Sequence, residues 1–154
     1  MRRPPAITWL PEFNVAVFAF LLNYPWELLQ GPLFERMAAA PHWEAVKMCT
    51  QAALGDVFIM LAAYWLVAAL AKSRRWIVAP TGLQLLLFMT LGALITIVIE
   101  QLALRGLWLE SWSYSPLMPV IPVVGVGLSP LVQWLVLPPV VVWFVRRQLA
   151  SAPI

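Results

Sequence analysis

Long apolar stretches dominate the pattern of hydrophobic and polar positions along this chain. They run from about Leu10 to Gln30, from about Val46 to Ala71, from about Gly82 to Leu104, and between Pro119 and Val145. A helix needs about 20 apolar residues to cross the hydrocarbon core of a bilayer, and each stretch is long enough. Strands are not expected, because the runs are long and do not alternate apolar with polar residues. The pattern predicts an all-α polytopic membrane protein with four transmembrane helices.

The fourth stretch contains prolines and glycines at a density that breaks helices. They are Pro116, Pro119, Pro122, Gly125, Gly127 and Pro130. Proline lacks the amide hydrogen of a helical turn and glycine favours turns, so we expect the fourth span to be interrupted. Ser129 followed by Pro130 is typical of a helix start, which predicts a regular helix from about Ser129 to Gln148. The apolar 118–128 segment is expected to be re-entrant or to lie against the outer surface.

Composition supports a membrane location and excludes several other classes of protein. Of the 154 residues, 62% are hydrophobic and 11% are charged, whereas soluble domains are roughly 45–50% apolar and about 25% charged. The length fits one domain, so we expect residues 1–154 to form a single transmembrane helical domain. The one cysteine excludes an intramolecular disulfide. The net charge of +3 gives no reason to expect a nucleic-acid partner.

Positive charges alternate from one side of the predicted spans to the other. Seven lie before the first span, between the second and third, or after the fourth: Arg2, Arg3, Lys72, Arg74, Arg75, Arg146 and Arg147. The other two connections hold three: Arg36, Lys47 and Arg105. The positive-inside rule then places both termini and the central basic loop in the cytoplasm. We expect a multi-pass protein of a bacterial-type inner membrane, with membrane lipids as its surroundings.

Three ionisable side chains fall inside the predicted spans, each on a different helix: Glu27, Asp56 and Glu100. Such groups are costly in a bilayer and mark functional sites by default. At about 1.5 Å per residue, Glu27 and Glu100 lie roughly one turn from the outer ends of their helices, and Asp56 lies deeper. No Lys or Arg is predicted inside the spans, so either some of these acids carry a proton or a cation lies among them. We predict that the three acids converge on one outward-facing pocket and act as its catalytic groups.

Uncharged polar and aromatic side chains extend this candidate site. The expected binding residues are Asn23, Trp26, Gln30, Gln51, Thr96, Gln133 and Trp134. Asn23, Glu27 and Gln30 are spaced i, i+4, i+7 and therefore share one helix face. The two tryptophans neighbour polar residues, where a ring could line a hydrophobic ligand site or stabilise a carbocation through its π face. In the alternative interpretation, the acids are neutral and hydrogen-bonded and only hold the helices together.

A second group of residues has side chains that suit soft metal ions. Met37, His42, Met48 and Cys49 lie close together in sequence, near the outer end of the second span. Thioether, thiolate and imidazole groups suit Cu(I), but this spacing matches no compact metal motif. His42, Met48 and Cys49 are therefore only an alternative metal site, and the sequence identifies no cofactor. Nucleophile triads, phosphate loops and zinc motifs are absent from the sequence.

From Glu100 onward the chain carries a series of short motifs. They are Glu100, Gly106-Leu107-Trp108, Trp112-Ser113-Tyr114-Ser115-Pro116, Pro130-Leu131-Val132-Gln133 and Pro138. Over about residues 100–139 this series resembles the short membrane lycopene cyclase domains and related carotenoid-biosynthesis membrane proteins. That family has paired glutamates where this chain has Val132 and Gln133. The resemblance implies an isoprenoid substrate, and the whole chain also resembles small four-span bacterial inner-membrane proteins.

Three functions are consistent with these features. The first is a membrane-embedded enzyme that adds a proton to an alkene of a lipid or isoprenoid, with Asp56 as the donor and Glu27 and Glu100 orienting it or relaying protons. The second is proton, cation or metal-ion handling by the acids. The third is an accessory or assembly subunit that binds other membrane subunits. A closed apolar slot beside Asp56 would favour the enzyme, and soft ligands gathered around Cys49 would favour a metal.

Overall fold

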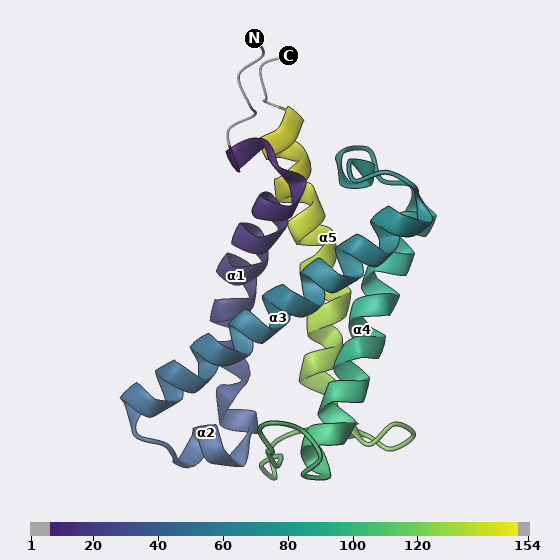
Figure 1. Cartoon of the computed structure of the whole chain (residues 1–154). Helices are drawn as coiled ribbons and strands as arrows, with labels where there is room; N and C mark the ends of the chain where they lie inside the picture. Colours follow the sequence, from purple (N-terminus) through teal and green to yellow (C-terminus); the bar gives the residue numbers. More distant parts are fainter. Residues whose placement is uncertain (1–6, 151–154) are drawn as a thin grey trace.

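The computed structural model describes residues 7–150 and is all-α apart from one small hairpin (Figure 1). The long helices are α1 (Pro11–Gln30), α3 (His42–Leu70), α4 (Gly82–Leu104) and α5 (Leu128–Ala150). The short elements are η1 (Ile7–Trp9), η2 (Gly31–Leu33), α2 (Glu35–Ala39), η3 (Trp76–Val78), β1 (Val120–Ile121) and β2 (Val126–Gly127). Arg2 and Arg3, two of the cations used to predict the topology, lie outside the described residues.

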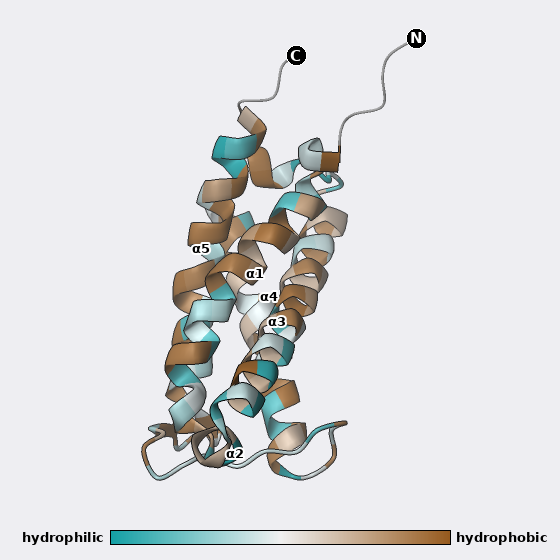
Figure 2. Cartoon of the chain, turned by 90° about the vertical axis from the view of Figure 1, so that its left-hand side faces the viewer, coloured by the Kyte–Doolittle hydropathy of each residue, from teal (hydrophilic) through white to brown (hydrophobic). Residues whose placement is uncertain are grey.

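Three of the long helices could cross a membrane. α3, α4 and α5 are long and apolar enough to do so, and fewer than half of the residues in the most apolar window of each are buried. Large apolar side chains such as Leu54, Leu86 and Leu135 therefore point outward, as lipid-facing residues do. Figure 2 shows hydrophobic residues along the helices. The prediction of membrane helices is confirmed at this level for three of the expected spans, and α1 forms a helix over the range expected for the first.

The interruption before α5 is confirmed in position. Regular helix begins at Leu128, one residue before the predicted start. The preceding segment forms an antiparallel hairpin in which Val120 pairs with Gly127 and Ile121 with Val126. Its turn places Gly125 at φ 62°, a conformation that costs a glycine little. The expectation of no strands was wrong here, because a short hairpin needs only a tight turn and a few backbone hydrogen bonds.

The long helices run back and forth, so the connections lie at two opposite ends (Figure 1). The start of α1, the 71–81 connection and the end of α5 lie at one end, whereas α2 and the 105–127 segment lie at the other. α1 packs against both α3 and α5, and α4 packs against α3 and α5. α3 crosses the others obliquely in Figure 1, so it diverges from α4 toward the α2 end. The cavity described below is lined by residues of both α3 and α4.

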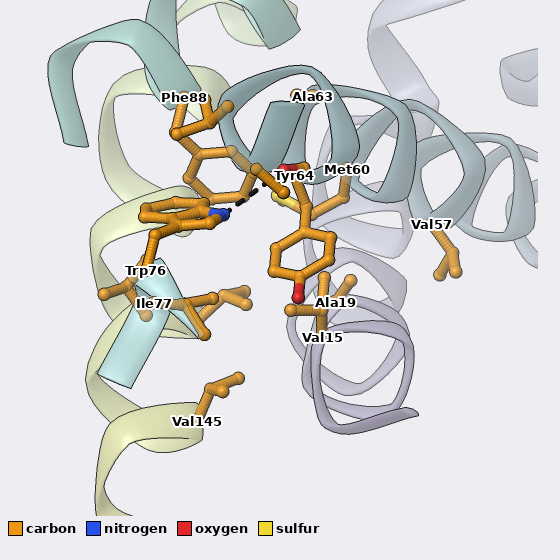
Figure 3. Packing of buried hydrophobic residues seen from close by; sticks show 14 of the residues in the cluster. Val15, Ala19, Val57, Met60, Ala63, Tyr64, Trp76, Ile77, Phe88 and Val145 are labelled. Carbon is orange, nitrogen blue, oxygen red and sulfur yellow. Dashed lines mark hydrogen bonds between the residues drawn. The ribbon is translucent and has the colours of Figure 1, made fainter. Parts of the chain in front are cut away.

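A hydrophobic core fills the other half of the molecule, toward the 71–81 connection. Tyr64, Trp76, Phe88 and Ile77 are buried and pack together there (Figure 3). Tyr64 stacks on Trp76 with ring centroids 5.8 Å apart, and Trp76 meets the edge of Phe88 at 5.5 Å. Dense aromatic packing of this kind excludes water. The core therefore separates the polar half of the molecule from the basic end.

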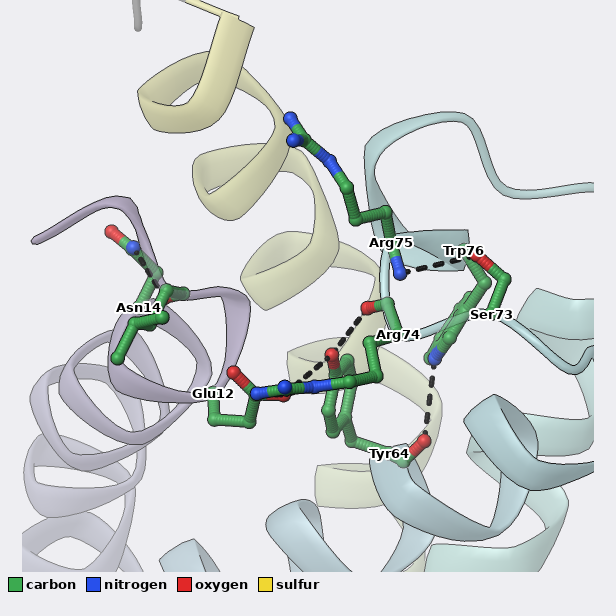
Figure 4. A network of polar contacts seen from close by, with 8 residues as sticks. Glu12, Asn14, Tyr64, Ser73, Arg74, Arg75 and Trp76 are labelled. Carbon is green, nitrogen blue, oxygen red and sulfur yellow. Dashed lines mark hydrogen bonds and ion pairs between the residues drawn. The ribbon is translucent and has the colours of Figure 1, made fainter. Parts of the chain in front are cut away.

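An ion pair ties the basic connection to the start of α1 (Figure 4). Arg74 lies 2.8 Å from Glu12 Oε1, and the Tyr64 hydroxyl hydrogen-bonds to the Arg74 carbonyl oxygen and lies 3.3 Å from Glu12 Oε1. Trp76 Nε1 donates to the Tyr64 carbonyl oxygen at 3.3 Å. Glu12 is thus paired at the end where positive charges collect, unlike the three acids predicted to form the site.

Close packing between α4 and α5 depends on Gly92. A Cβ atom added there would lie 2.0 Å from Cζ3 of Trp134, which is nearly fully buried. We expect Gly92→Ala to destabilise the protein by about 1–3 kcal/mol, because an overpacked interface must shift backbone or ring. Gly55→Ala is the matched control, since nothing lies within 4 Å of its added Cβ. Thermal unfolding in detergent checks this, and equal melting temperatures for the two variants would contradict it.

Candidate functional site

A cavity of about 610 Å³ lies between α3 and α4 at the α2 end of the molecule. The three acids predicted to form the site, Glu27, Asp56 and Glu100, all line it, as do Gln30, Gln51, Thr96 and Gln133. Most of its remaining wall is apolar or aromatic, including Phe34, Ile59, Ile99, Trp108 and Trp112. The structure therefore brings the three predicted acids to one cavity. The volume lies within the range of small-molecule sites, about 300–1,000 Å³.

Gln133 lies at the centre of the polar part of this cavity. Its Nε2 atom is 2.8 Å from Asp56 Oδ2, 3.2 Å from Glu27 Oε1 and 2.7 Å from Asn23 Oδ1. An amide nitrogen carries two hydrogens, so the three acceptors compete for two donors. Glu27 and Asp56 thus share one amide nitrogen, which brings their two carboxyl groups close together. Two negative charges this close repel each other, which favours a proton shared between the two carboxyl groups.

Gln30 fixes the position of Glu27 from the same helix. Gln30 Nε2 donates to Glu27 Oε1 at 2.6 Å, and Gln30 Oε1 accepts from Ser129 Oγ at 2.7 Å and from Trp26 Nε1 at 3.2 Å. The i, i+3 spacing in α1 places the two side chains one turn apart on one face. Ser129 stands at the start of α5, so the interruption before α5 positions a donor for the site.

Glu100 is held by the segment that follows α4. Trp112 Nε1 donates to Glu100 Oε2 at 3.0 Å, and the Tyr114 hydroxyl donates to the same oxygen at 2.5 Å. The backbone N–H of Gly127 donates to the Tyr114 oxygen at 2.9 Å. Burial, together with the nearby Glu100 carboxyl, raises the pKa of Tyr114, so its hydroxyl keeps its proton and remains a donor. The 105–127 segment is thus anchored over one side of the cavity by Glu100.

Tyr114, Phe34 and Arg36 were missed as site residues. Phe34 and Arg36 line the cavity, and Phe34 contacts the Tyr114 ring edge-on at 5.6 Å. Tyr114 could have been found from the sequence, because it belongs to an aromatic run that begins 12 residues after Glu100. That run lies on the same side of the predicted membrane as Glu100. Arg36 is exposed at the cavity wall. No signal in the sequence placed this connection against the cavity, since it depends on the fold of α2.

The remaining predicted binding residues divide into two groups. Thr96 and Gln51 line the cavity, with Gln51 exposed and Thr96 buried. Asn23, Trp26 and Trp134 are not among the lining residues. Asn23 reaches the site only through Gln133 and Trp26 only through Gln30, whereas Trp134 faces Gly92 of α4. The Trp134 ring packs against Gly92, and the cavity's aromatic wall comes instead from Phe34, Trp108 and Trp112.

The alternative soft-metal residues do not form one site. Cys49 is buried, and its thiol donates to the Glu27 carbonyl oxygen at 3.4 Å and lies 3.9 Å from the sulfur of Met37. Met48 lines the cavity, but His42 is exposed at the start of α3. Within residues 7–150 no group of three or more His, Cys, Asp and Glu side chains is placed to hold a metal ion. The imidazole that a Cu(I) site would use lies at the helix end instead.

The ion pairs that the structure describes, Lys47–Glu44 and Arg74–Glu12, leave out Glu27, Asp56 and Glu100. The hydrogen-bond partners of these three acids are amides, an indole and a phenol. Carboxyl groups held by hydrogen bonds beside an apolar cavity can give and take protons there.

Comparison of the chain with family models, curated proteins and solved structures finds no match.

Proposed function

We propose that this chain is a small integral membrane enzyme whose carboxyl pocket carries out acid–base chemistry on an isoprenoid or other lipid. The observation that carries the proposal is the Glu27–Asp56 pair, two carboxyl groups that share the Gln133 amide at the wall of a largely apolar cavity. An apolar cavity of about 610 Å³ suits a hydrocarbon group rather than a hydrated ion. The cavity beside Asp56 is open along α3 rather than closed, and its apolar wall is the feature that favours a lipid over a metal ion.

Asp56 is the proton donor in this proposal. Its carboxyl adds a proton to one carbon of a C=C bond, which forms a C–H bond and leaves a tertiary carbocation and the Asp56 carboxylate. Loss of a proton from a neighbouring carbon to Asp56 or Glu27 restores a double bond. The product is a rearranged or cyclised isomer, so no oxidant or reductant is consumed. Gln133 positions both carboxyl groups throughout, because its amide reaches each of them.

The aromatic wall supports carbocation chemistry in this cavity. Phe34, Trp108 and Trp112 line the cavity together with the acids. The negative face of an aromatic ring attracts a cation by about 0.5–1 kcal/mol at exposed sites and by more when water is excluded. These rings replace Trp26 and Trp134, which were the aromatic residues expected in this role.

An isoprenoid is the substrate class that the resemblance to membrane lycopene cyclase domains favours. Six residues of the resembling motifs contribute to this site: Tyr114 donates to Glu100, and the cavity is lined by Glu100, Trp108, Trp112, Pro130 and Gln133. Gln133 stands where that family has one of its paired glutamates. In this chain Glu27 and Asp56 lie against that amide. We therefore propose that carboxyl groups from α1 and α3 supply the acid function.

Deuterium uptake tests the proposed chemistry whatever the structure of the product. Purified protein is placed in nanodiscs that contain a long-chain polyprenol, in D₂O buffer, and the extracted lipid is examined by mass spectrometry. Each protonation and deprotonation cycle exchanges carbon-bound hydrogen for deuterium. We expect time-dependent deuterium in C–H bonds of the lipid with the protein present. Deuterium uptake no faster than in empty nanodiscs would overturn the proposal.

The membrane topology is part of the proposal. We propose that α1 is the first of four spans, that both termini are cytoplasmic, and that the cavity opens on the outer side of a bacterial-type inner membrane. Ser73 and Ala40 lie in connections at opposite ends of the molecule. Ser73→Cys is therefore expected to react with a membrane-impermeant thiol reagent only after the membrane is opened, and Ala40→Cys in intact cells. The unaltered chain, with its buried Cys49, is the blank, and equal labelling of both variants would contradict this topology.

A further inference from the structure

The cavity reaches the surface of the molecule along the side of α3. Gln51, Gly55 and Phe58 line the cavity and are exposed, and the Phe58 side chain is 71% exposed. An added Cβ at Gly55 would meet no atom within 4 Å. α3 is one of the helices apolar enough to cross a membrane, so this mouth lies on a helix side that would face lipid. A ligand dissolved in the bilayer can enter there without crossing water.

The charges around the cavity disfavour an anionic headgroup. The acids Glu27, Asp56, Glu100 and Glu110 line it, whereas Arg36 is the lining cation among the described residues. A phosphate group in a site with this excess of carboxyl groups would be repelled or would require extra protons. These charges therefore favour an uncharged lipid over one with an anionic headgroup.

Thr96 indicates that this lipid carries a polar atom. The Thr96 hydroxyl is buried without a hydrogen-bond partner, in a residue that is 7% exposed and lines the cavity. A buried unpaired hydroxyl costs free energy, and rotation of the Thr96 side chain toward the cavity would let a ligand hydroxyl or carbonyl group recover it. Thr96 stands one helical turn before Glu100, so that polar end would lie close to the acids.

We infer that the cavity takes the hydroxyl-bearing end of a long, uncharged lipid, which enters from the bilayer along α3 beside Gly55. A cavity of about 610 Å³ holds a drug-sized group. A long chain therefore leaves its tail between α3 and the surrounding lipid. This inference names the substrate class for the proposed acid–base site and rests on that proposed function, but it concerns binding and is measured without any chemical conversion.

Native mass spectrometry from nanodiscs tests the entry route and the charge preference together. Nanodiscs contain either a long-chain polyprenol or the matching polyprenyl phosphate at the same mole fraction. We expect the protein to retain the alcohol at least tenfold more than the phosphate. Gly55→Trp should lower retention of the alcohol about tenfold because its ring fills the mouth. Gly82→Trp, at the exposed start of α4 where an added Cβ also meets nothing, should retain it like the unaltered protein.

Thr96→Val tests the polar end, because valine keeps the shape and removes the hydroxyl. It should lower retention of polyprenol several-fold, whereas Thr50→Val should not, since Thr50 donates to the Val46 carbonyl oxygen within its own helix. Equal retention by the Gly55→Trp and Gly82→Trp variants, or preference for the phosphate, would overturn the inference. Lipid retention without deuterium uptake would refute the proposed chemistry and leave the binding inference standing.

Discussion

Replacing Asp56 with asparagine is expected to slow deuterium uptake into the lipid by about 10²–10⁴-fold, the usual contribution of a positioned general acid. The amide cannot supply the proton that the carbon–carbon double bond needs. The fold should persist, because an asparagine side chain still offers an oxygen to Gln133, whose Nε2 lies 2.8 Å from Asp56 Oδ2. The measurement is the initial rate in D₂O beside a thermal unfolding curve of the same sample.

Glu44→Gln is the matched control for this variant. It makes the same carboxyl-to-amide change on α3, but Glu44 pairs with the exposed Lys47 and does not line the cavity. Its rate should equal that of the unaltered protein. If the three acids only hold the helices together, Asp56→Asn will be as silent as Glu44→Gln, and that result would refute a catalytic role for Asp56.

Gln133→Leu should cause the largest loss of stability among changes in the site. Leucine removes the amide that Asn23, Glu27 and Asp56 share, and Asn23 Oδ1 is then left buried without this donor. A buried acceptor without a partner costs about 1–3 kcal/mol, and more where the acceptor is charged. Thermal unfolding in detergent should therefore show a melting temperature several degrees below that of the unaltered protein.

Gln148→Leu provides the comparison for Gln133→Leu. It makes the same substitution on α5 at an exposed position near the other end of the helix. Its melting temperature should stay within about a degree, because surface substitutions usually change stability by less than about 0.5 kcal/mol. Similar losses in both variants would show that the amide network around Gln133 contributes nothing specific.

The helices could be predicted from the sequence because their signals are local. The 82–104 helix has the predicted bounds, and the α5 start differs from the prediction by one residue. Runs of apolar residues and a Ser-Pro pair determine such boundaries without reference to distant parts of the chain. The 120–127 hairpin could not be predicted, because each of its strands has only two residues and carries no periodic signal.

The sequence predicted those parts of the candidate site whose positions depend on helix spacing alone. Depth along each helix and the i, i+4, i+7 face were enough to bring Glu27, Asp56 and Glu100 to one cavity. The direction of a ring depends on neighbouring helices, and Gly92 on α4 is what lets Trp134 pack away from the cavity. Tyr114 and Arg36 belong to connections whose path depends on tertiary contacts. One such contact is the isolated antiparallel β-bridge between Phe34 and Tyr114.

Native mass spectrometry of the protein released from its own membranes tests the central claim most directly, because it identifies what the cavity holds before any lipid is chosen. We predict one uncharged isoprenoid or other hydroxyl-bearing lipid per chain, retained by Gly82→Trp and lost from Gly55→Trp. A protein that carries a metal ion or a second subunit, and no such lipid, would contradict the account.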